Sequence, residues 1–515
     1  MSTPDQTAFD EGALGAYARA GAEPDRLALI GPDGREVTFG ELGEAVNRLS
    51  NALRALGLGQ GDVIASLLHN SPTHYELVLA TGQIGVFLVP INVHLGPAEA
   101  GYIIADSGAK ALVAHGDLAA GLAPIAGDLP AARFTVGEPV AGWHDYAGLV
   151  ASGSASLPAD RVAGMMMGYT SGTTGRPKGV RRQVPPIPPE LLAIGFAALM
   201  ASFDLHPGAG VHLVCSPLYH AAPGNISMQL LHLGHTLVIQ SKFDAEQVLR
   251  DLERYRVTSS HMVPTHLHRI MRLPAETRER YDLTSLTNLL VAGAPFAPDA
   301  KQAVLDWLGP VVWEYLASTE GMVAIAPPAD ALSHPGTVGR PVAGVKILDP
   351  DGGPVPTGEV GRIYFAMQMP FEYLNDPAKT AAAIDADGYA TAGDLGRLDE
   401  DGYVYLLDRR DDLIISGGVN IYPSEVEQRL MGYPAVADVA VIGAADPEWG
   451  QTVVAVLQLE PGWTPGDSLI EALDRHCRDG LAGEKCPRRY EFRPTLPRTA
   501  SGKLLRRVLR EKLDA

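Results

Sequence analysis

The run Tyr169-Thr170-Ser171-Gly172-Thr173-Thr174-Gly175-Arg176-Pro177-Lys178-Gly179 decides how the rest of the sequence is interpreted. Four hydroxyl residues and three glycines precede or surround a single lysine, Lys178. Glycines allow a backbone to approach a ligand closely, hydroxyl and amide groups donate to oxygen atoms, and lysine supplies a countercharge. The run is not a Walker A loop, because Lys178 is followed by Gly179 instead of Ser or Thr. It predicts a different type of polyphosphate-binding loop.

Length and composition limit the class of protein around this loop. The chain has 515 residues, enough for about three folding units, and 46% of them are hydrophobic. Its 41 basic and 60 acidic residues give a net charge of 41 − 60 = −19, which argues against nucleic-acid binding. Three scattered cysteines make no disulfide framework or metal motif. Neither a signal peptide nor a membrane span is visible, so we expect a cytoplasmic protein.

Hydrophobic periodicity predicts strands that alternate with helices. Thr38 and Glu41 form a capping box before a helical pattern that runs to Leu56, and Gly57 is a suitable helix stop. A second helix is predicted over residues 76–84, and strands are predicted over residues 63–68, 111–114 and 236–240. This alternation indicates α/β architecture with parallel sheets.

The composition changes near Arg409–Asp412, which divides the chain into predicted domains of residues 1–409 and 410–515. The smaller unit has predicted strands at 436–442 and 452–459 and a helix at 468–477. Its last segment, 488–515, has nine basic and three acidic residues. That segment is interpreted either as a solvated basic helix or as a site for phosphates.

Further motifs follow the phosphate loop in a fixed order over nearly the whole chain. They are Val291-Ala292-Gly293-Ala294-Pro295, Ser318-Thr319-Glu320, Asp394 in Thr391-Ala392-Gly393-Asp394, Arg409, and Pro497-Arg498-Thr499-Ala500-Ser501-Gly502-Lys503. The set resembles AMP-forming acyl-CoA synthetases, members of the adenylate-forming superfamily that includes luciferases and peptide-synthetase adenylation domains. The resemblance implies a large N-terminal part with mainly parallel sheets and a β-subdomain, followed by a small mobile α+β domain.

The resemblance also implies a role for each matched residue. ATP phosphates would lie against Thr170, Ser171, Gly172, Thr173, Thr174, Gly175 and Lys178. The adenine would meet Gly293, Ala294, Pro295 and the segment Leu316, Ala317 and Ser318, and the ribose would meet Asp394 and Arg409. Thr319 and Lys503 would hold the α-phosphate, and Glu320 would bind Mg²⁺. Such groups are needed because a carboxylate anion must attack the phosphorus of a second anion.

A second step follows from the same resemblance. The C-terminal domain would rotate about the hinge residue Asp411, withdraw Lys503, and bring Gly417 and Gly418 in to form a tunnel for the pantetheine of CoA. Glycines suit a narrow channel beside a backbone because they have no Cβ atom. An ordinary tight turn is the alternative interpretation of the glycine pair.

Two positions depart from the family pattern. Leu316 and Ala317 stand where a Tyr-Gly pair is usual, and the tyrosine of that pair stacks on adenine. Its loss is worth ~0.5–1.5 kcal/mol, which would weaken ATP binding without preventing it. Ala392 replaces a common hydroxyl residue. Neither change affects a charged catalytic group, so activity is expected.

The acid pocket is expected in the segment 216–225, where Ala221 and Gly224 are small and Asn225 follows them. Small side chains predict a wide, mostly apolar pocket, and no cation stands there to bind a second carboxylate. His220 either orients the substrate carboxylate or forms a wall. We therefore expect a bulky hydrophobic monoacid of lipid or secondary metabolism.

The expected activity uses ATP, Mg²⁺ and CoA to convert this acid into acyl-CoA, AMP and pyrophosphate. One alternative enzyme stops at acyl-AMP or passes the acyl group to a carrier protein or a downstream acyltransferase. Another alternative is a nucleotide-binding module that has lost catalysis, against which Lys178, Glu320 and Lys503 argue. A light-emitting oxygenase has no support in the sequence.

Overall fold

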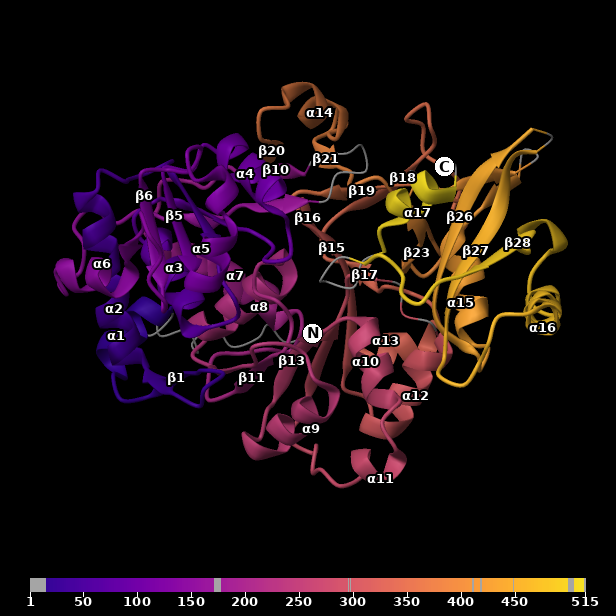
Figure 1. Ribbon diagram of the computed structural model, residues 1–515, viewed down its shortest axis with the longest axis horizontal. Helices are drawn as coiled ribbons and strands as arrows, with labels where there is room; N and C mark the ends of the chain where they lie inside the picture. The colour runs from indigo at the N-terminus through magenta and orange to yellow at the C-terminus, as the bar shows by residue number, and fades with distance from the viewer. Residues whose placement is uncertain are drawn as a thin grey trace.

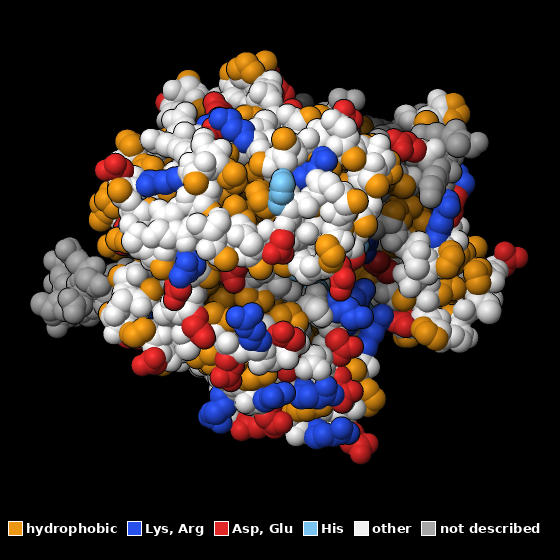
Figure 2. Space-filling model, turned by 60° about the vertical axis from the view of Figure 1, so that its left-hand side comes forward, with side chains coloured by type: hydrophobic (Ala, Val, Ile, Leu, Met, Phe, Trp, Pro, Cys, Tyr) orange, Lys and Arg blue, Asp and Glu red, His pale blue; other side chains and the backbone are white. Residues whose placement is uncertain are grey.

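The computed structural model describes residues 15–170, 177–294, 296, 298–409, 412–416, 419–447, 449–498 and 504–513. Figure 1 shows the N-terminal sheet and its helices at one end of the long axis and the yellow C-terminal unit at the other. Figure 2 shows basic and acidic side chains interspersed over the lower part of the molecule. Among the helices described, none is long and apolar enough to cross a membrane.

The first sheet has six strands, and every neighbouring pair in it is parallel. Their order is β7 (His144–Asp145), β6 (Ala132–Val136), β5 (Ala111–His115), β3 (Val63–Leu67), β4 (Phe87–Pro90) and β8 (Met165–Met166). The helices of this region are α2 (Phe39–Ala55), α3 (Pro72–Gly82), α4 (Pro97–Asp106), α5 (Gly116–Gly121), η2 (Ala123–Ile125) and α6 (Tyr146–Ser152). The predicted strands at 63–68 and 111–114 are confirmed as β3 and β5.

The second sheet has nine strands, parallel from β15 to β1 and antiparallel at both edges. Their order is β17 (Arg340–Pro341), β16 (Gly321–Ala326), β15 (Val312–Ser318), β14 (Asn288–Val291), β13 (Ser259–Met262), β11 (Val211–Val214), β12 (Thr236–Ile239), β1 (Leu27–Ile30) and β2 (Glu36–Thr38). Its helices are α1 (Ala16–Ala22), α7 (Pro189–Ala201), α8 (Ala221–His232), α9 (Ala245–Arg254), α10 (Pro264–Met271), α11 (Ala275–Arg278), α12 (Pro298–Leu308) and α13 (Pro328–Ser333). The parallel sheets confirm the predicted α/β class.

Two smaller antiparallel sheets lie between these layers and the C-terminal unit. One contains β9 (Gly168–Thr170), β10 (Lys178–Arg182) and β20 (Phe371–Tyr373). The other contains β18 (Val345–Leu348), β19 (Gly361–Ala366), β21 (Tyr389–Ala390), β22 (Asp394–Leu398) and β23 (Val404–Arg409), with α14 (Pro377–Ala382) beside them. A shared apolar cluster connects the two sheets through Val180, Phe365 and Phe371.

The C-terminal unit has an apolar core that includes Val426, Val441, Leu457 and Leu473. Its elements are β24 (Ile414–Ser416), β25 (Val419–Ile421), α15 (Pro423–Met431), β26 (Val436–Asp446), β27 (Gly450–Leu459), α16 (Asp467–Arg478), η4 (Gly483–Lys485), β28 (Arg489–Phe492) and α17 (Arg506–Leu513). Strands β26 and β27 form a long hairpin, and β28 pairs with β27 in parallel.

Local sequence signals explain several helix ends. At the start of α2 the Thr38 hydroxyl accepts from the Glu41 amide at 3.2 Å, and the Glu41 carboxylate accepts from the Thr38 amide at 2.8 Å. The predicted capping box is therefore confirmed, and Gly57 follows the helix with a φ of 83°. Helix α3 begins at Pro72, four residues before the predicted start, because proline fits the first helical position.

All three cysteines are free and buried. Burial raises the pKa of the Cys215 thiol to about 12 and that of Cys477 to about 11, and it also raises the pKa of Cys486. None of these thiols ionises near neutral pH.

Candidate active site

The predicted phosphate loop connects two strands of a hairpin. Thr170 at the end of β9 lies opposite Lys178 at the start of β10, and Tyr169 lies opposite Gly179. The predicted contacts Ser171, Gly172, Thr173, Thr174 and Gly175 fall outside the described residues. The antiparallel pairing holds Thr170 and Lys178 together at the base of the loop.

Gly168 connects this hairpin with two other predicted motifs. A Cβ atom at Gly168 would lie 3.2 Å from the Thr319 methyl carbon and 3.9 Å from the Ala221 Cβ. The phosphate-loop strand, the Thr319 segment and the start of the acyl segment therefore meet at one point. More than 50 residues separate each pair of these positions in the chain.

Glu320 is 6% exposed, and three hydroxyl groups surround it. The Tyr373 hydroxyl donates to Oε1 at 2.7 Å, and the Thr319 hydroxyl donates to Oε2 at 3.0 Å. The Glu320 amide donates to the Ser318 hydroxyl at 3.2 Å. A carboxylate with hard oxygen donors beside it has the chemistry that Mg²⁺ prefers. The described residues contain no cluster of three potential metal ligands, so a metal here would need oxygen atoms from a phosphate or from water.

Basic side chains face the same hydroxyl–carboxylate pair. The Lys178 ammonium lies 5.4 Å from the centre of the Tyr373 ring, and the Lys379 ammonium lies 5.9 Å from it. Arg182 donates to the Thr319 carbonyl at 2.7 Å. Burial lowers the pKa of Arg182, while the nearby Glu320 charge opposes that shift. The site therefore concentrates positive charge where phosphates are expected.

Sequence reasoning missed Tyr373, Lys379 and Arg182. Tyr373 lies 53 residues beyond Glu320, and it reaches the site because β20 pairs with β10, with Tyr373 opposite Val180. A lone tyrosine between two turns carries no sequence signal for such a position. Arg182 carried only a weak signal, since it stands four residues after Lys178 on the same strand face.

The predicted nucleotide residues lie at strand ends. Gly293 follows β14 with a φ of 89°, a conformation that favours glycine, and Ala294 follows it. Asp394 begins β22, is 7% exposed, and lies opposite Arg409. Pro295 and the Arg409 side chain are outside the described set.

Leu316 and Ala317 lie on opposite faces of β15. Leu316 is 8% exposed and belongs to the apolar cluster that contains Phe371 and Tyr373, whereas Ala317 packs against the main core. The leucine therefore supplies apolar surface without the aromatic face that stacks on a base.

The acyl segment leads into helix α8. His220 is the residue before the helix, and burial together with the nearby His94 lowers its pKa to about 4. Its Nε2 atom has no hydrogen-bond partner among the described residues. Gly224 is buried, and a Cβ there would lie 2.8 Å from the Leu218 carbonyl oxygen. His220 is therefore neutral at physiological pH and can accept or donate one hydrogen bond.

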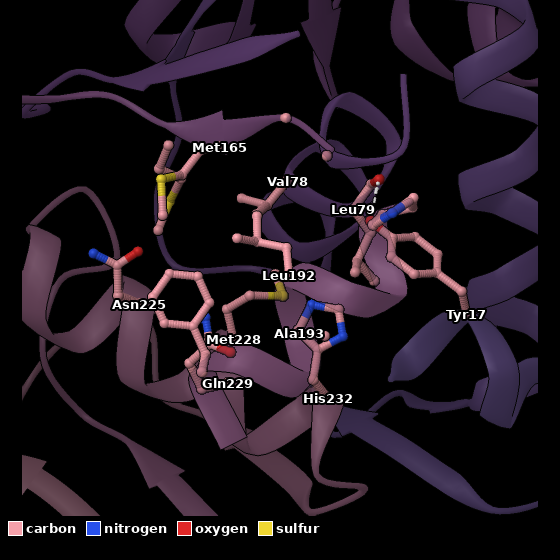
Figure 3. A pocket seen from close by; sticks show the side chains of 15 residues that line it. Tyr17, Val78, Leu79, Met165, Leu192, Ala193, Asn225, Met228, Gln229 and His232 are labelled. Atoms are coloured by element: carbon pink, nitrogen blue, oxygen red, sulfur yellow. Dashed lines mark hydrogen bonds between the residues drawn. The ribbon is translucent and has the colours of Figure 1, made fainter. Parts of the chain in front are cut away.

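A cavity of about 60 Å³ lies along one face of α8 (Figure 3). Asn225 is exposed at the end of the cavity nearer Ala221, and His232 lies about two helical turns further along α8. The walls are mainly apolar and include Val78, Leu79, Met165, Met166, Leu192, Phe196 and Met228. Helix α8 rises ~16 Å from Ala221 to His232, so the cavity extends away from the point where Gly168 meets Thr319. Methionine-rich walls adapt to ligands of different shape.

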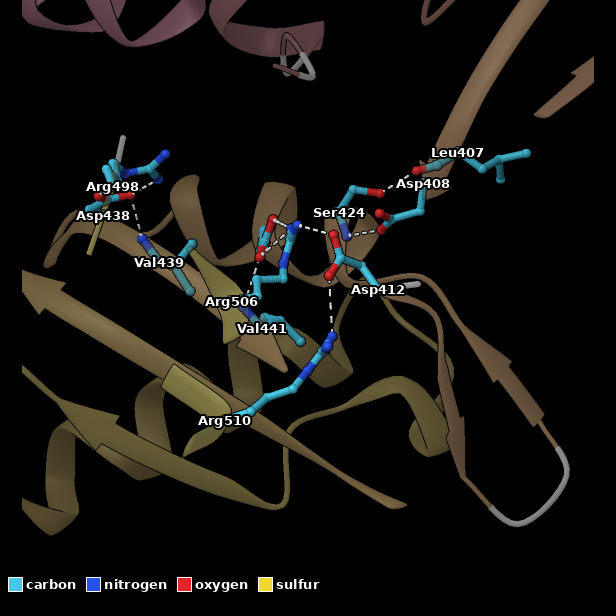
Figure 4. A network of polar contacts seen from close by, with 11 residues as sticks. Leu407, Asp408, Asp412, Ser424, Asp438, Val439, Val441, Arg498, Arg506 and Arg510 are labelled. Carbon is cyan, nitrogen blue, oxygen red and sulfur yellow. Dashed lines mark hydrogen bonds and ion pairs between the residues drawn. The ribbon is translucent and has the colours of Figure 1, made fainter. Parts of the chain in front are cut away.

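The C-terminal motif residues Lys503, Asp411, Gly417 and Gly418 fall outside the described residues. Around them, Arg506 of α17 contacts Asp412 at 3.1 Å and Glu427 at 2.7 Å, and Arg510 contacts Asp412 at 3.2 Å (Figure 4). These ion pairs attach α17, which follows the Lys503 motif, to Asp412, which follows the predicted hinge residue Asp411.

The basic C-terminal segment is largely paired within its own unit. Besides Arg506 and Arg510, Arg498 pairs with Asp438 and Arg489 with Glu491. Arg506 fits neither the solvated-helix nor the phosphate-site interpretation of this segment, because its half-buried side chain forms ion pairs with Asp412 and Glu427.

One ion pair joins the C-terminal unit to the larger part of the chain. Arg272, at the end of α10, pairs with Glu460, and its guanidinium lies 3.4 Å from the Val436 carbonyl oxygen and 3.5 Å from that of Ala437.

Known proteins are similar to this chain over most of its length. Residues 17–372 match the AMP-binding enzyme family, and residues 425–503 match the AMP-binding enzyme C-terminal domain. A feruloyl-CoA synthase from Amycolatopsis sp. is 36% identical over 96% of this chain and 98% of its own length. The fatty acid–[acyl-carrier-protein] ligase ScoC from Streptomyces coeruleorubidus is 32% identical over 95% and 94%.

Solved structures give the same result. ATP-bound MatB from Rhodopseudomonas palustris is 30% identical, covers 97% of this chain and 98% of its own, and superimposes with a TM-score of 0.83. The apo form of MatB, with the same identity and coverage, gives 0.72. The arrangement of this chain is thus nearer to that of the ATP-bound relative.

Proposed function

Because this chain belongs to the AMP-binding enzyme family and is an acid–thiol ligase, we propose that it converts a bulky hydrophobic carboxylic acid into its CoA thioester. The reaction uses ATP and passes through an acyl-adenylate. One observation carries this proposal: a Cβ atom placed on Gly168 of the phosphate hairpin would lie 3.2 Å from the Thr319 methyl carbon and 3.9 Å from the Ala221 Cβ. The phosphate hairpin and the acyl segment are therefore adjacent at Gly168. A protein that only binds a nucleotide does not need this arrangement.

In the first half-reaction an oxygen of the substrate carboxylate attacks the α-phosphorus of ATP. The new O–P bond forms as the bond to pyrophosphate breaks. Lys178 balances charge on the departing pyrophosphate, and Thr319 and Lys503 hold the α-phosphate and the attacking carboxylate. Glu320 would hold Mg²⁺, which would supply charge stabilisation to the phosphate oxygens. Losing one such contact costs ~10²–10³ in rate.

The same proposal places the rest of the nucleotide. The loop from Thr170 to Gly175 surrounds the phosphates, Asp394 and Arg409 bind the ribose hydroxyls, and the adenine lies between residues 293–295 and 316–318. Leu316 offers an apolar contact in place of stacking. We therefore expect ATP to bind more weakly than it would to a variant with tyrosine at that position, by ~0.5–1.5 kcal/mol.

In the second half-reaction the CoA thiolate attacks the acyl carbonyl, and AMP leaves. We propose that residues 410–515 rotate as one body about Asp411, so that Lys503 withdraws and Gly417 and Gly418 line the path of the thiol. The ion pairs of Arg506 support motion as one body, because they join α17 to Asp412 beside the hinge.

The lining of the cavity beside α8 supports a hydrophobic acid. The cavity is lined mainly by apolar side chains and begins one helical turn from Ala221, where the carboxylate would lie. The feruloyl-CoA synthase relative favours an aryl acid. A second candidate, transfer to a carrier-protein thiol, is favoured by the relative ScoC.

A mass-spectrometric assay tests these proposals. Purified protein is incubated with ATP, Mg²⁺ and aliphatic, aryl, fatty, steroidal or diterpenoid acids, each with and without CoA. Acyl-CoA from one bulky class supports the main proposal. Acyl-AMP that persists when CoA is present contradicts it and favours the carrier-protein route. The absence of AMP and pyrophosphate with every acid would contradict both.

A further inference from the structure

Tyr373 connects three groups that the proposed adenylation requires. Its hydroxyl donates to Glu320 Oε1 at 2.7 Å, and its ring lies 5.4 Å from the Lys178 ammonium. The other Glu320 oxygen, Oε2, accepts from Thr319 at 3.0 Å. Glu320 and Tyr373 are 6% and 7% exposed. The contact is therefore shielded from bulk water.

Burial makes this hydrogen bond consequential. A buried carboxylate is costly unless donors satisfy it, and a hydrogen bond to a charged acceptor is about twice as strong as a neutral one. The Tyr373 ring is itself fixed, because it packs edge-on against Phe371 with ring centres 5.4 Å apart. Its backbone amide also donates to the Thr380 hydroxyl at 2.9 Å. A fixed donor sets the direction of the carboxylate that accepts from it.

The two donors to Glu320 differ in what else they must do. In the proposed reaction Thr319 turns its hydroxyl to the α-phosphate, which takes a donor away from Oε2. The Tyr373 hydroxyl donates to the other oxygen, Oε1, at 2.7 Å. When Thr319 leaves, Oε2 becomes available to a metal ion while Oε1 stays held.

We infer that Tyr373 is a positioning residue that holds Glu320 in the orientation needed for Mg²⁺ on the nucleotide. This inference rests on the proposed function. The tyrosine acts through Glu320 and does not touch the reacting atoms. Its ring also lies within about 6 Å of the Lys178 and Lys379 ammonium groups, so one side chain holds the metal ligand and contacts two cations.

The test is the Mg²⁺ dependence of nucleotide binding in Tyr373→Phe. This variant keeps the ring, its packing and its face toward Lys178, and it removes only the hydroxyl. Binding of a non-hydrolysable ATP analogue is titrated with Mg²⁺ by calorimetry, without acid or CoA. We expect the half-saturating Mg²⁺ concentration to rise about tenfold. Analogue affinity without Mg²⁺ should stay within about twofold of the wild-type value.

Two further variants separate positioning from a structural role. Tyr364→Phe on β19 is the matched control, because it removes a hydroxyl that only accepts a 3.4 Å contact from Arg362. It should leave the Mg²⁺ titration unchanged. Glu320→Ala removes the carboxylate through which Tyr373 acts, so adding Tyr373→Phe to it should produce no further shift.

The outcomes are distinguishable. If Tyr373→Phe is half-saturated at the same Mg²⁺ concentration as the wild-type protein, the inference is overturned, even when the variant is less stable. A further shift in the double variant also overturns it. If the wild-type protein bound the analogue without any Mg²⁺ dependence, the proposed function would fail before the question about Tyr373 arose.

Discussion

Removing the Arg272 side chain should shift the balance between the two half-reactions. Arg272→Ala deletes the ion pair with Glu460 that links α10 to the C-terminal unit. The side chains are 38% and 25% exposed, so the pair is worth ~0.2–1 kcal/mol, and the two long contacts to Val436 and Ala437 add little. A loss of ~1 kcal/mol changes a two-state population about fivefold.

The direction follows from the comparison with MatB. This arrangement is nearer to that of the ATP-bound relative than to that of its apo form, and under the proposed function we expect the ion pair to favour ATP binding. We therefore expect Arg272→Ala to lower ATP–pyrophosphate exchange by up to about fivefold while acyl transfer from supplied acyl-AMP to CoA is unchanged or faster.

The assay measures both half-reactions for Arg272→Ala, Glu460→Ala and the double variant. Arg280→Ala is the matched control, because it removes a surface ion pair with Glu246 that lies within the larger part of the chain. If Arg272 and Glu460 are coupled, the effect of the double variant should be smaller than the sum of the two single effects. This difference should decrease as the salt concentration rises. If the ratio of the two half-reaction rates is the same in the wild-type protein and in Arg272→Ala, this reasoning is refuted.

Three other changes have defined outcomes. Thr38→Ala removes the capping box of α2 and should lower stability by ~1 kcal/mol, measured by urea denaturation with exposed Ser154→Ala as the control. Ala193→Leu should fill the cavity beside α8 and reduce kcat/KM for bulky acids while short acids are spared; an equal loss for both would contradict the placement of the acyl tail. Burial lowers the pKa of His74 to about 4 and that of His261 to about 3, whereas an unfolded histidine titrates near 6.5. Below pH 6.5 the unfolded chain therefore binds more protons than the folded chain. The free energy of unfolding should therefore decrease toward pH ~4 by ~1.4 kcal/mol per pH unit for each histidine, and a urea midpoint that stayed constant over this range would contradict it.

The fold was predictable where local chemistry determines structure. The capping box at Thr38 and the apolar runs that became β3, β5 and β12 depend on residues a few positions apart. Helix α3 shows the limit of this approach, because the periodicity signal began later than the proline that starts the helix. The short strands β9 and β20 had no pattern of their own, and they exist because a neighbour pairs with them.

The candidate site was predictable only where a motif is contiguous. Thr170, Lys178, Thr319 and Glu320 were found as parts of short runs, and the structure brings their segments together around Gly168. Tyr373 was not found, since its role depends on the pairing of β20 with β10 across almost 200 residues of chain. Antiparallel pairing between distant segments leaves no mark at the residue itself.

The buried cysteines have a consequence for a protein that handles a thiol. Thiolates exchange with disulfides, so an accessible cysteine reacts with oxidised forms of CoA. Cys215, Cys477 and Cys486 are shielded and remain protonated near neutral pH, so the resting protein offers no nucleophile for that side reaction. Because these thiols are buried, a cysteine introduced on each side of residue 410 would be labelled selectively. The distance between the two labels would then test the proposed domain rotation.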